Sequence, residues 1–467
     1  MPGPFFGIGI ASNALRSFQR ALDITGHNIA NVNTPGYSRQ VADFGTQDLA
    51  GFWSNGRQWI GSGVGITSVN RIRDMFLDAR MREGQADLGR FEMLAGSLKQ
   101  IEGVFNEPSD NGISSALNKF FDAWSGLASN PNDPGAKLQV KLAGETLAGR
   151  VRSTYGELSR MSDQINGQVG ATIDEINGLA TEIQTLNDEI RQAAIQGGPP
   201  NDLLDRRDAA IERLSGLANV NTRTFEDGTV SVYIGQHTLV EPARPPNPLP
   251  TTFDASTGRL GTPPNHIDIT AGRLRGLLDA SFKIEGSSTV PGLKGQLDNL
   301  ANTLRTEVNG LHKTIADPLD TSERFFNDVT PPAAQTGAID FDLTVTIKND
   351  PTRIISGVNG PGDGSIALKL SGLRDTRLPS LGNKTIQGFY RDGIADLGRE
   401  SRLYNDRLTT QVAVVGQIDA QRQSVMGVSL DDEMANMLRF QRSYQAAAKV
   451  LTIFDQVTED LIGMLRR

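Results

Sequence analysis

Residues 7–40 read GIGIASNALRSFQRALDITGHNIANVNTPGYSRQ, and the pattern within them decides how the chain folds. Apolar residues recur every seven positions, with two more between them: Ile8, Leu15, Leu22 and Ile29, joined by Ala11 and Phe18. Such a heptad is typical of a helix that packs along another helix. The pattern therefore predicts a helix from about residue 7 to residue 29.

This helix has a defined stop in residues 31–40. Pro35 and Gly36 suit the second and third positions of a type II turn, in which the glycine supplies the positive φ. Thr34 precedes the proline and is therefore disfavoured in the helical region. We expect the helix to end here and the chain to leave the turn in an extended conformation.

The C-terminal region repeats the heptad. Two seven-residue series lie three positions apart there: Met437, Tyr444, Leu451 and Leu465, and Phe440, Ala447, Phe454 and Leu461. Two such helices at opposite ends of the chain predict that the termini meet each other or meet copies of themselves. This arrangement favours assembly rather than catalysis.

Helical patterns dominate residues 74–217. The clearest is a narrow apolar seam over residues 165–194, which predicts a long helix in a bundle or coiled coil. Gly-Gly-Pro-Pro at residues 197–200 ends it, and Asn201 or Asp202 can cap the next helix. The two helices are expected to form an antiparallel pair. Earlier in the chain, residues 61–66 are interpreted as a glycine-rich loop that leads into a short strand.

Strands are predicted at two places in the second half of the chain. Residues 222–234 alternate around an Asp-Gly pair, which is a strong hairpin signal, and residues 341–347 show a short strand pattern. Helical patterns return over residues 271–312. They return again from about residue 384 to the C-terminus, with a break near Gly427.

The chain is therefore expected to be mainly α with β inserts, and to consist of nested parts. The outer elements of the sequence enclose the inner ones, which lets the two ends pair. The expected parts are a terminal α-helical coiled-coil pair for assembly (1–40 and 425–467), a long helical bundle (41–218, 271–312 and 376–424) and a small β-rich outer insert (219–270 and 313–375).

The composition excludes several classes of function. A net charge of −8 and a pI near 5.2 argue against non-specific nucleic-acid binding, which needs a basic patch. The sequence has no cysteine, which excludes disulfides and thiolate chemistry. No apolar run approaches the roughly 18–20 residues of a membrane span. No signal-peptide pattern is present, so if the protein leaves the cytoplasm, we expect it to do so without a cleaved signal peptide.

We find no pattern typical of a catalytic, cofactor or metal site. The four histidines lack metal-ligand spacing, and no nucleophile elbow is present. His27 is interpreted as a helix-end or interface residue rather than a base. The acidic residues 431–433 suit a helix start. Residues 201–208, Asn-Asp-Leu-Leu-Asp-Arg-Arg-Asp, are interpreted as a helix start whose arginines pair locally or across the bundle.

The apolar seams of the terminal helices allow two interpretations. Each seam could be the core-facing stripe of a globular bundle, which is the interpretation favoured for the internal helices. For the terminal helices we favour seams that become buried on assembly, because no compact domain precedes or follows them. The residues predicted at the subunit interface are Ile8, Leu15, Phe18, Leu22, Ile29, Asn31, Pro35, Gly36, Tyr37, Met437, Phe440, Tyr444, Leu451, Phe454 and Leu461.

Two of these stretches resemble a known group of proteins. Ala-Asn-Val-Asn-Thr-Pro-Gly-Tyr-Ser-Arg-Gln at residues 30–40, after an apolar heptad helix, resembles the N-terminal signature of bacterial flagellar rod, hook and hook-associated proteins. Residues 429–446, Ser-Leu-Asp-Asp-Glu-Met-Ala-Asn-Met-Leu-Arg-Phe-Gln-Arg-Ser-Tyr-Gln-Ala, resemble the matching C-terminal signature. Residues 201–208 and 357–375 are similar to stretches of the hook-associated protein 1 family.

The resemblance implies a structural protein at the junction between the flagellar hook and filament, outside the cell, exported through the flagellar type III apparatus. It implies a ring of copies of this chain in contact with the hook protein and a second junction or filament-side protein. It also implies an export chaperone on the C-terminal helix, and no cofactor. The alternatives are a hook or distal rod protein and, less favoured, a flagellum-associated hydrolase, for which no acid/base or metal site is visible.

Overall fold

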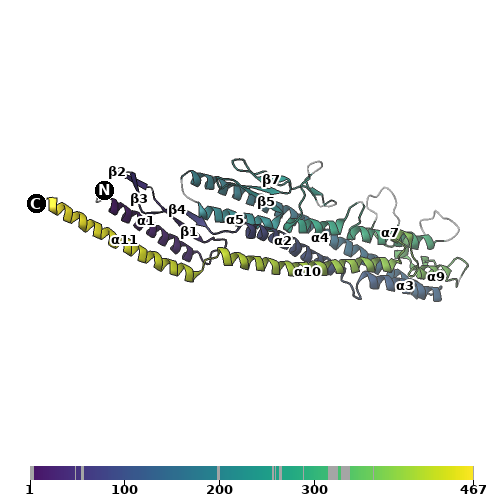
Figure 1. Cartoon of the computed structure of the whole chain (residues 1–467). Coiled ribbons are helices and arrows are strands. Elements are labelled where there is room, and N and C mark those ends of the chain that lie inside the picture. Colours follow the sequence, from purple (N-terminus) through teal and green to yellow (C-terminus); the bar gives the residue numbers. More distant parts are fainter. Residues whose placement is uncertain are drawn as a thin grey trace.

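Long helices run along one axis and give the molecule an elongated shape (Figure 1). This computed structural model describes residues 5–465 except 48, 54–56, 197–199, 255–256, 258, 262–265, 288, 314–323, 328–336 and 361. In chain order the α-helices are α1 (Phe5–Ala30), α2 (Met75–Phe105), α3 (Ile113–Ser129), α4 (Pro134–Ile195), α5 (Asn201–Leu217), α6 (Gly272–Glu285), α7 (Leu293–Leu311), α8 (Val345–Asn349), α9 (Ser365–Gly372), α10 (Ile386–Met426) and α11 (Leu430–Leu465).

Short antiparallel strands lie between the helices in two stretches of the chain. The prediction of a mainly α fold with β inserts is therefore confirmed. The strands are β1 (Gln40–Thr46), β2 (Leu49–Trp53), β3 (Arg57–Gly61), β4 (Val64–Arg71), β5 (Val220–Thr224), β6 (Val230–Ile234), β7 (His237–Val240), β8 (Phe253–Asp254) and β9 (Arg259–Leu260).

The two ends of the chain lie side by side at one end of the molecule (Figure 1). The helices α1 and α11 run antiparallel. Asn28, near the end of α1, bonds Glu433 at the start of α11. At the opposite end of the pair, Gly7 of α1 lies against the ring of Phe454. The prediction that the termini meet is confirmed within one chain, and we call α1 and α11 the terminal pair.

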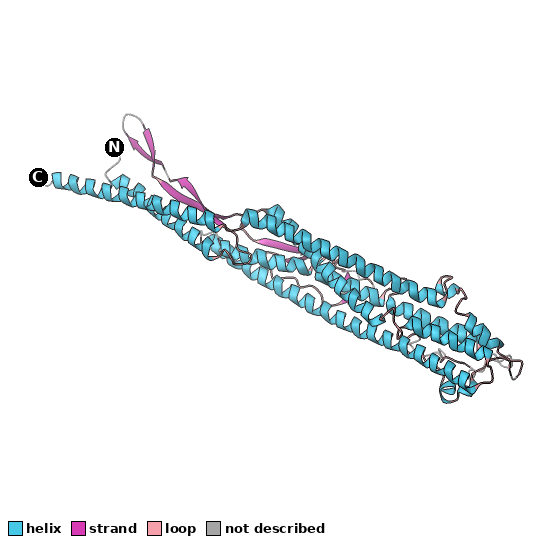
Figure 2. Ribbon diagram, turned by 90° about the horizontal axis from the view of Figure 1, so that it is seen from below, coloured by secondary structure: helices cyan, strands magenta, loops and turns pink. Residues whose placement is uncertain are grey.

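Strands β1 to β4 form a long hairpin beside the terminal pair (Figure 2). Strand β1 pairs with β4 and β2 pairs with β3, both antiparallel. The strand expected after the glycine-rich loop at residues 61–66 is β4. The sequence pattern did not reveal β1, β2 or β3. Because β1 and β4 contact α1, this hairpin lies with the terminal pair rather than within the bundle.

The bundle is built around α4, a helix of 62 residues that is about 90 Å long at 1.5 Å per residue. Its start is fixed by Asp133, whose carboxylate accepts hydrogen bonds from two backbone N–H groups of the first turn, and by Pro134. Helices α2 and α10 run antiparallel along the bundle, because Glu102 bonds Ser401 at one end and Gly84 bonds Gln411 further along. The helical region expected over residues 74–217 corresponds to α2, α3, α4 and α5.

Glycines allow three helices of the bundle to approach closely. A Cβ placed on Gly89 of α2 would lie 2.2 Å from the backbone oxygen of Gly216 in α5. A Cβ placed on Gly276 of α6 would lie 2.6 Å from the backbone oxygen of Arg90. Both distances are far below normal contact, so the backbones of α2, α5 and α6 touch at positions where only glycine fits.

One large apolar core extends through the bundle, and its residues come from elements between α2 and α10. At the end far from the termini it is aromatic: the rings of Phe120, Trp124, Phe325 and Phe326 pack edge to face or tilted. A smaller cluster of Met81, Val415 and Ile418 holds α10 on α2.

The hairpin predicted around Asp227 and Gly228 is confirmed. Strand β5 pairs with β6 in antiparallel register, with Thr224 opposite Val230, and β7 adds a third strand. Gly228 takes a φ of +80°, which explains the need for glycine in this turn. The inner face of β6 is buried against α4, where Asn187 exchanges two hydrogen bonds with the backbone of Val230.

The strand predicted over residues 341–347 is wrong. Thr344 instead caps the short helix α8, because its hydroxyl accepts a hydrogen bond from the N–H of Ile347. Phe341 and Leu343 are buried while Val345 is 72% exposed, so the alternation of the sequence reflects loop packing followed by a helix start.

Two further predictions about helix ends need correction. The helical stretch over residues 271–312 is interrupted by a tight turn in which Gly286, with φ of +72°, approaches Gly292. The cap of α5 is Pro200, without a side-chain bond, because the side chains of Asn201 and Asp202 bond Gln40 instead. The break predicted at residues 197–200 begins in residues that lie outside the described part of the chain, and α4 ends at Ile195.

We predict that Gly89→Ala destabilises the bundle, because the added methyl group would overlap the backbone of α5. The expected loss is about 1–3 kcal/mol in the free energy of unfolding, measured by urea denaturation. Gly96→Ala is the matched control in the same helix, where nothing lies within 4 Å of the new Cβ. That variant should be more stable than the wild type by about 1 kcal/mol. Equal effects of both substitutions would contradict the close packing of α2.

Candidate assembly surface

The terminal pair is held together by a face of α1 that is poor in large residues. Its buried positions are small or polar: Ala11, Ser17, Ala21, Thr25 and Asn28. On α11 the most buried positions are Glu433 and Ala447. Small residues let two helices approach closely, so the pair is narrow and most of its large side chains lie at its edges.

The residues predicted at a subunit interface are therefore only partly covered within one chain. Pro35 and Gly36 are exposed, and Leu461 is 44% exposed. The others are half-buried: Ile8, Leu15, Phe18, Leu22, Ile29, Asn31, Tyr37, Met437, Phe440, Tyr444, Leu451 and Phe454. Ala21 and Asn28 of the buried face precede Leu22 and Ile29 of the predicted series by one residue, whereas buried Ala11 belongs to the predicted pattern itself.

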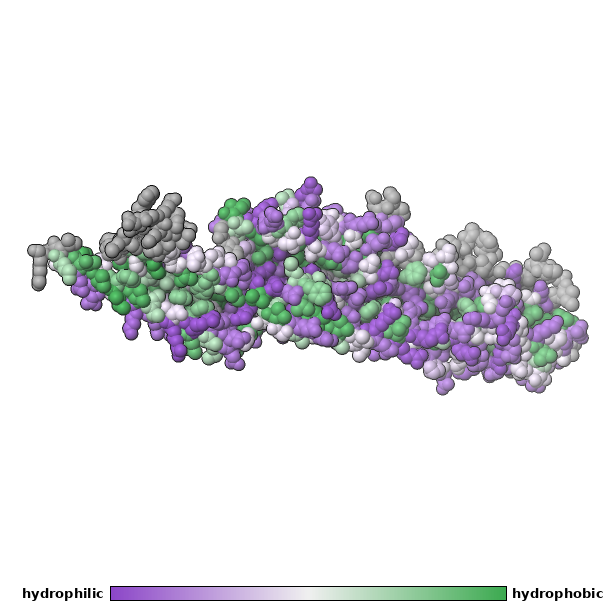
Figure 3. Space-filling view, viewed as in Figure 1, coloured by the Kyte–Doolittle hydropathy of each residue, from purple (hydrophilic) through white to green (hydrophobic). Residues whose placement is uncertain are grey.

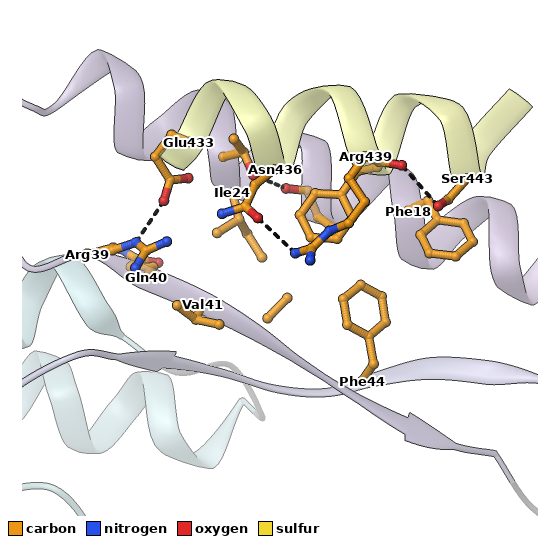
Figure 4. Close-up of a pocket in the computed structure, with 14 residues that line it drawn as sticks. Phe18, Ile24, Arg39, Gln40, Val41, Phe44, Glu433, Asn436, Arg439 and Ser443 are labelled. Atoms are coloured by element: carbon orange, nitrogen blue, oxygen red, sulfur yellow. Dashed lines mark hydrogen bonds and ion pairs between the residues drawn. The ribbon is translucent and has the colours of Figure 1, made fainter. Parts of the chain in front are cut away.

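The hairpin of strands β1 to β4 packs against one side of the terminal pair. The ring of Phe44 on β1 lies 5.9 Å from that of Phe18 on α1 and 5.8 Å from that of Phe440 on α11. The three rings line a cavity of about 400 Å³. Figure 4 labels Phe18 and Phe44 beside it, with Arg39 and Glu433 at its polar end. The cavity lies between α1, β1 and α11, of which α11 is remote from the other two in the sequence.

The turn after α1 has the type II geometry that the sequence predicts. The N–H of Tyr37 donates to the carbonyl of Thr34 at 3.2 Å, and Gly36 between them has a φ of +79°. These values describe a type II turn, with Pro35 supplying its fixed φ. The turn folds the ring of Tyr37 back onto α1, where it packs edge-on against His27.

A network of buried polar groups joins the two ends of the chain. The hydroxyl of Tyr37 donates to Oδ1 of Asn28 at 2.7 Å, and the backbone N–H of Gln40 donates to the same oxygen at 3.0 Å. The Nδ2 of Asn28 donates to the carbonyl of Gln40 and to Oε2 of Glu433. The other carboxylate oxygen of Glu433 accepts from Nε of Arg39 at 2.7 Å. We call these five residues the terminal latch.

Burial raises the pKa of Tyr37, and the nearby carboxylates of Asp202, Asp205 and Glu433 raise it further. The phenol therefore keeps its proton and remains a hydrogen-bond donor to Asn28. Glu433 is buried, with 3% of its side chain exposed, and a buried carboxylate is tolerated only when it is paired. The latch supplies both Arg39 and Asn28 as its partners.

A second polar cluster fixes the terminal pair to the bundle. Asp205 on α5 accepts from the backbone N–H and the hydroxyl of Ser38 and from Arg71. Asp208, one turn later, pairs with Arg71 at 3.0 Å and with Arg73 at 3.2 Å. We call these five residues the joint, since they connect the turn after α1, the end of β4 and the start of α5.

More contacts surround the joint. Gln40 bonds Asn201 and Asp202 at the start of α5, and Arg422 on α10 pairs with Glu212 at 2.7 Å. Of the two arginines in the 201–208 run, Arg207 pairs as the sequence predicted: it pairs with Asp208 next to it and donates to the carbonyl of Gly228. These contacts support a structural role for the run.

Burial opposes the ionisation of Asp208, but Arg73, Arg207 and Arg71 outweigh it, so the pKa of Asp208 lies below its usual value. A carboxylate whose pKa is depressed by folding stabilises the fold above its unfolded pKa. That contribution is lost as the pH falls through the folded pKa.

The last turns of α11 extend past the described start of α1. Gly7 lies beside Phe454, so α11 continues for about three turns beyond the contact. Its apolar residues are exposed there, as the green surface at the end of the molecule shows (Figure 3): Val457 47%, Leu461 44%, Ile462 50% and Met464 75%. We call this segment the overhang.

Sequence reasoning did not identify Asn28, Glu433 or Asp205 as key residues. Glu433 was interpreted only as part of an acidic helix start, which it also is. A signal for Asn28 was available, because a polar residue occupies the same heptad position as Ala21. Nothing local indicated that these side chains meet residues hundreds of positions away.

The described residues contain no group of three or more His, Cys, Asp or Glu side chains placed to hold a metal ion. Within the same part of the chain, no helix has the length and apolar character needed to cross a membrane. His27 lies at the end of α1 with Nε2 3.9 Å from Asp202, in keeping with its interpretation as a helix-end residue.

Comparison with known families matches three segments of the chain. A model described as the flagellar hook-associated protein FlgK helical domain matches residues 98–326. The model of the flagellar basal body rod FlgEFG protein C-terminal region matches residues 420–464, and that of the flagella basal body rod protein matches residues 8–37. The terminal pair and the bundle therefore define a flagellar axial protein.

Similar proteins match over nearly the full chain. The flagellar hook-associated protein 1 of Bacillus subtilis is 28% identical over 502 aligned positions, covering 99% of this chain and 99% of the relative. That of Escherichia coli is 24% identical, covering 98% and 99%. The chain is therefore similar over nearly its full length to the flagellar hook-associated protein 1 family, whose members are structural components of the flagellum.

The fold also matches a solved structure. The flagellar hook junction protein FlgK from Burkholderia pseudomallei superposes with a TM-score of 0.62 at 17% identity, covering 75% of this chain and all of that chain. This likeness supports the elongated helical architecture.

We predict that Asp205→Ala lowers the free energy of unfolding by about 3 kcal/mol, because it leaves Arg71 and Ser38 short of a partner in a buried site. Urea denaturation measures the effect. Asp202→Ala is the matched control in the same helix turn, with a side chain 61% exposed, and should cost less than about 1 kcal/mol. Equal losses would contradict the role of the joint.

The joint is also expected to weaken in acid. Asp208→Asn should reduce stability most at neutral pH, where the wild-type carboxylate is charged. The difference between the two proteins should shrink as the pH falls below about 4, where the aspartate of the unfolded chain is protonated. Unfolding curves between pH 7 and pH 3 test this. A difference independent of pH would show that charge on Asp208 does not stabilise the fold.

Proposed function

We propose that this chain is a structural adaptor at the junction between the hook and the filament of a bacterial flagellum, and that it polymerises through its terminal pair. The observation that carries this is the overhang of α11 together with the half-buried seams beside it. Relatives over nearly full length are named hook-associated protein 1, which supports the same place in the flagellum.

The exposed side chains of the terminal pair suit burial between copies. Covering one large apolar side chain contributes roughly 1.5–3 kcal/mol, and several such residues lie on each copy. Association costs cancel part of this gain. A ring or short helix of copies would cover Val457 and Leu461 on every copy except those at its edge.

The terminal latch and the joint support a mechanical role for the chain. They hold the turn after α1, the start of α11 and the start of α5 in one polar network. A terminal pair fixed in this way would transmit load from an inner assembled layer to the bundle outside it. The bundle, whose core does not include residues of α1 or α11, would form the next shell.

The partners of this adaptor follow from its place. We infer contacts with further copies of the chain, with the hook protein on one side and with a second junction or filament-side protein on the other. We also infer export through the flagellar type III apparatus without a cleaved signal peptide. An export chaperone that covers the C-terminal helix would protect the apolar overhang before assembly, because an exposed apolar patch favours aggregation.

Truncation in cells tests the proposal. In a strain lacking its own copy, the full-length chain should restore filaments on hooks. Chains lacking residues 1–29, or everything after Gly427, should fail to do so, since each lacks one helix of the terminal pair. Electron microscopy of the cells gives the fraction of hooks that carry filaments.

Both truncated chains should nevertheless fold, because the main core lies in the bundle. Circular dichroism of the purified chains should show a cooperative thermal transition of the helical bundle. Filament assembly by either truncated chain would contradict the role of the terminal pair. Filaments in the deletion strain without any added copy would contradict the proposed function itself.

A further inference from the structure

The charges of α11 beyond its acidic first turn are segregated by sign along the helix. The middle of the pair carries exposed basic residues: Arg16 and Arg20 on α1, and Arg439, Arg442 and Lys449 on α11. The far end of α11 carries exposed acidic residues: Asp455, Glu459 and Asp460. We call these sets the basic band and the acidic tip.

The segregation is plain in the sequence of α11. Residues 434–454 contain no Asp or Glu, and residues 455–465 contain no Lys or Arg. Among the residues that the structure describes, neither the basic band nor the acidic tip forms an ion pair within the chain. Arg439 donates to the amide oxygen of Asn436 and lies over the ring of Phe440, so its charge is not neutralised there.

The two sets cannot reach each other within one copy. The α11 members of the two sets lie on one continuous helix, and their centres are separated by about 15 residues or roughly 22 Å at 1.5 Å per residue. A helix cannot fold back on itself over that distance. Neutralisation of the acidic tip by the basic band therefore requires a second copy.

Apolar residues accompany the acidic tip. Val450, Val457 and Met464 recur every seven residues, and all are at least 42% exposed. Leu438, next to the basic band, is 55% exposed. A contact that joins these surfaces would combine apolar burial with complementary charge, which is the usual composition of a specific interface.

We propose that neighbouring copies pack side by side and parallel, staggered along the axis by roughly 22 Å, so that the acidic tip of one copy lies on the basic band of the next. This inference rests on the proposed function and specifies its contact. The two surfaces of the contact differ. A copy whose acidic tip is bound therefore still has its basic band available for a further copy. Because each copy is displaced along the axis relative to the last, such a heterologous contact continues from copy to copy and generates a helix rather than a closed ring.

Charge reversal tests the contact. Glu459→Arg with Asp460→Arg reverses the acidic tip, and Arg442→Glu with Lys449→Glu reverses part of the basic band. Each reversed chain, as the sole copy in the cell, should reduce the fraction of hooks with filaments at least tenfold. The chain that carries all four substitutions should recover most of the wild-type fraction, because neighbouring copies are again complementary.

The control reverses Asp174 and Glu175, two adjacent exposed acidic residues on α4, and should leave assembly unchanged. Full assembly by both reversed chains would overturn the inference and leave the proposed function intact. Loss of assembly in all three reversed chains, without recovery in the combined chain, would also overturn it. Failure of the wild-type chain to restore filaments would instead reject the proposed function.

Cross-linking gives a second, direct readout. The natural sequence has no cysteine, so Arg442→Cys with Glu459→Cys introduces the only two thiols. They are about 17 residues apart on one helix, far beyond the 4.4–6.8 Å between Cα atoms that a disulfide allows. Oxidised flagella should therefore yield a ladder of linked copies. Arg442→Cys with Glu175→Cys should yield none, and absence of the ladder from the first variant would overturn the inference.

Discussion

The buried carboxylate of Glu433 is the contact on which the joining of the two chain ends depends. It lies between the two ends of the chain and is matched by the guanidinium of Arg39 and the amide of Asn28. A buried carboxylate without partners would be costly, so this contact forms only when α1, the turn after it and α11 are all in place. Through Asn28, the same network fixes Tyr37 and the first residue of β1.

The next contacts along the molecule join the terminal pair to the bundle. Asp205 accepts a hydrogen bond from Ser38, and Asp208 forms ion pairs with Arg71 and Arg73. These contacts connect the terminal pair to the near end of the bundle. The long helices then carry the structure away from the termini. A narrow, exposed pair at one end and an aromatic core at the other suit a protein whose ends assemble while its bundle forms an outer layer.

Local patterns predicted the parts of this structure that depend on local physics. The type II turn at Pro35 and Gly36 and the hairpin turn at Gly228 follow from residues that permit positive φ. Contacts such as that of Asn28 with Glu433 were out of reach, because no local pattern relates residues so far apart. The wrong strand at residues 341–347 shows the same limit, since an alternating pattern fitted a capped helix start at Thr344 equally well. The division into nested domains stays a prediction.

The central claim is that this chain occupies the boundary between hook and filament as an assembled structural layer. Immunogold electron microscopy of intact flagella, with an antibody raised against the bundle, tests it most directly. Gold particles are expected only at the point where the curved hook meets the filament. Labelling along the hook, along the filament or at the rod would contradict it.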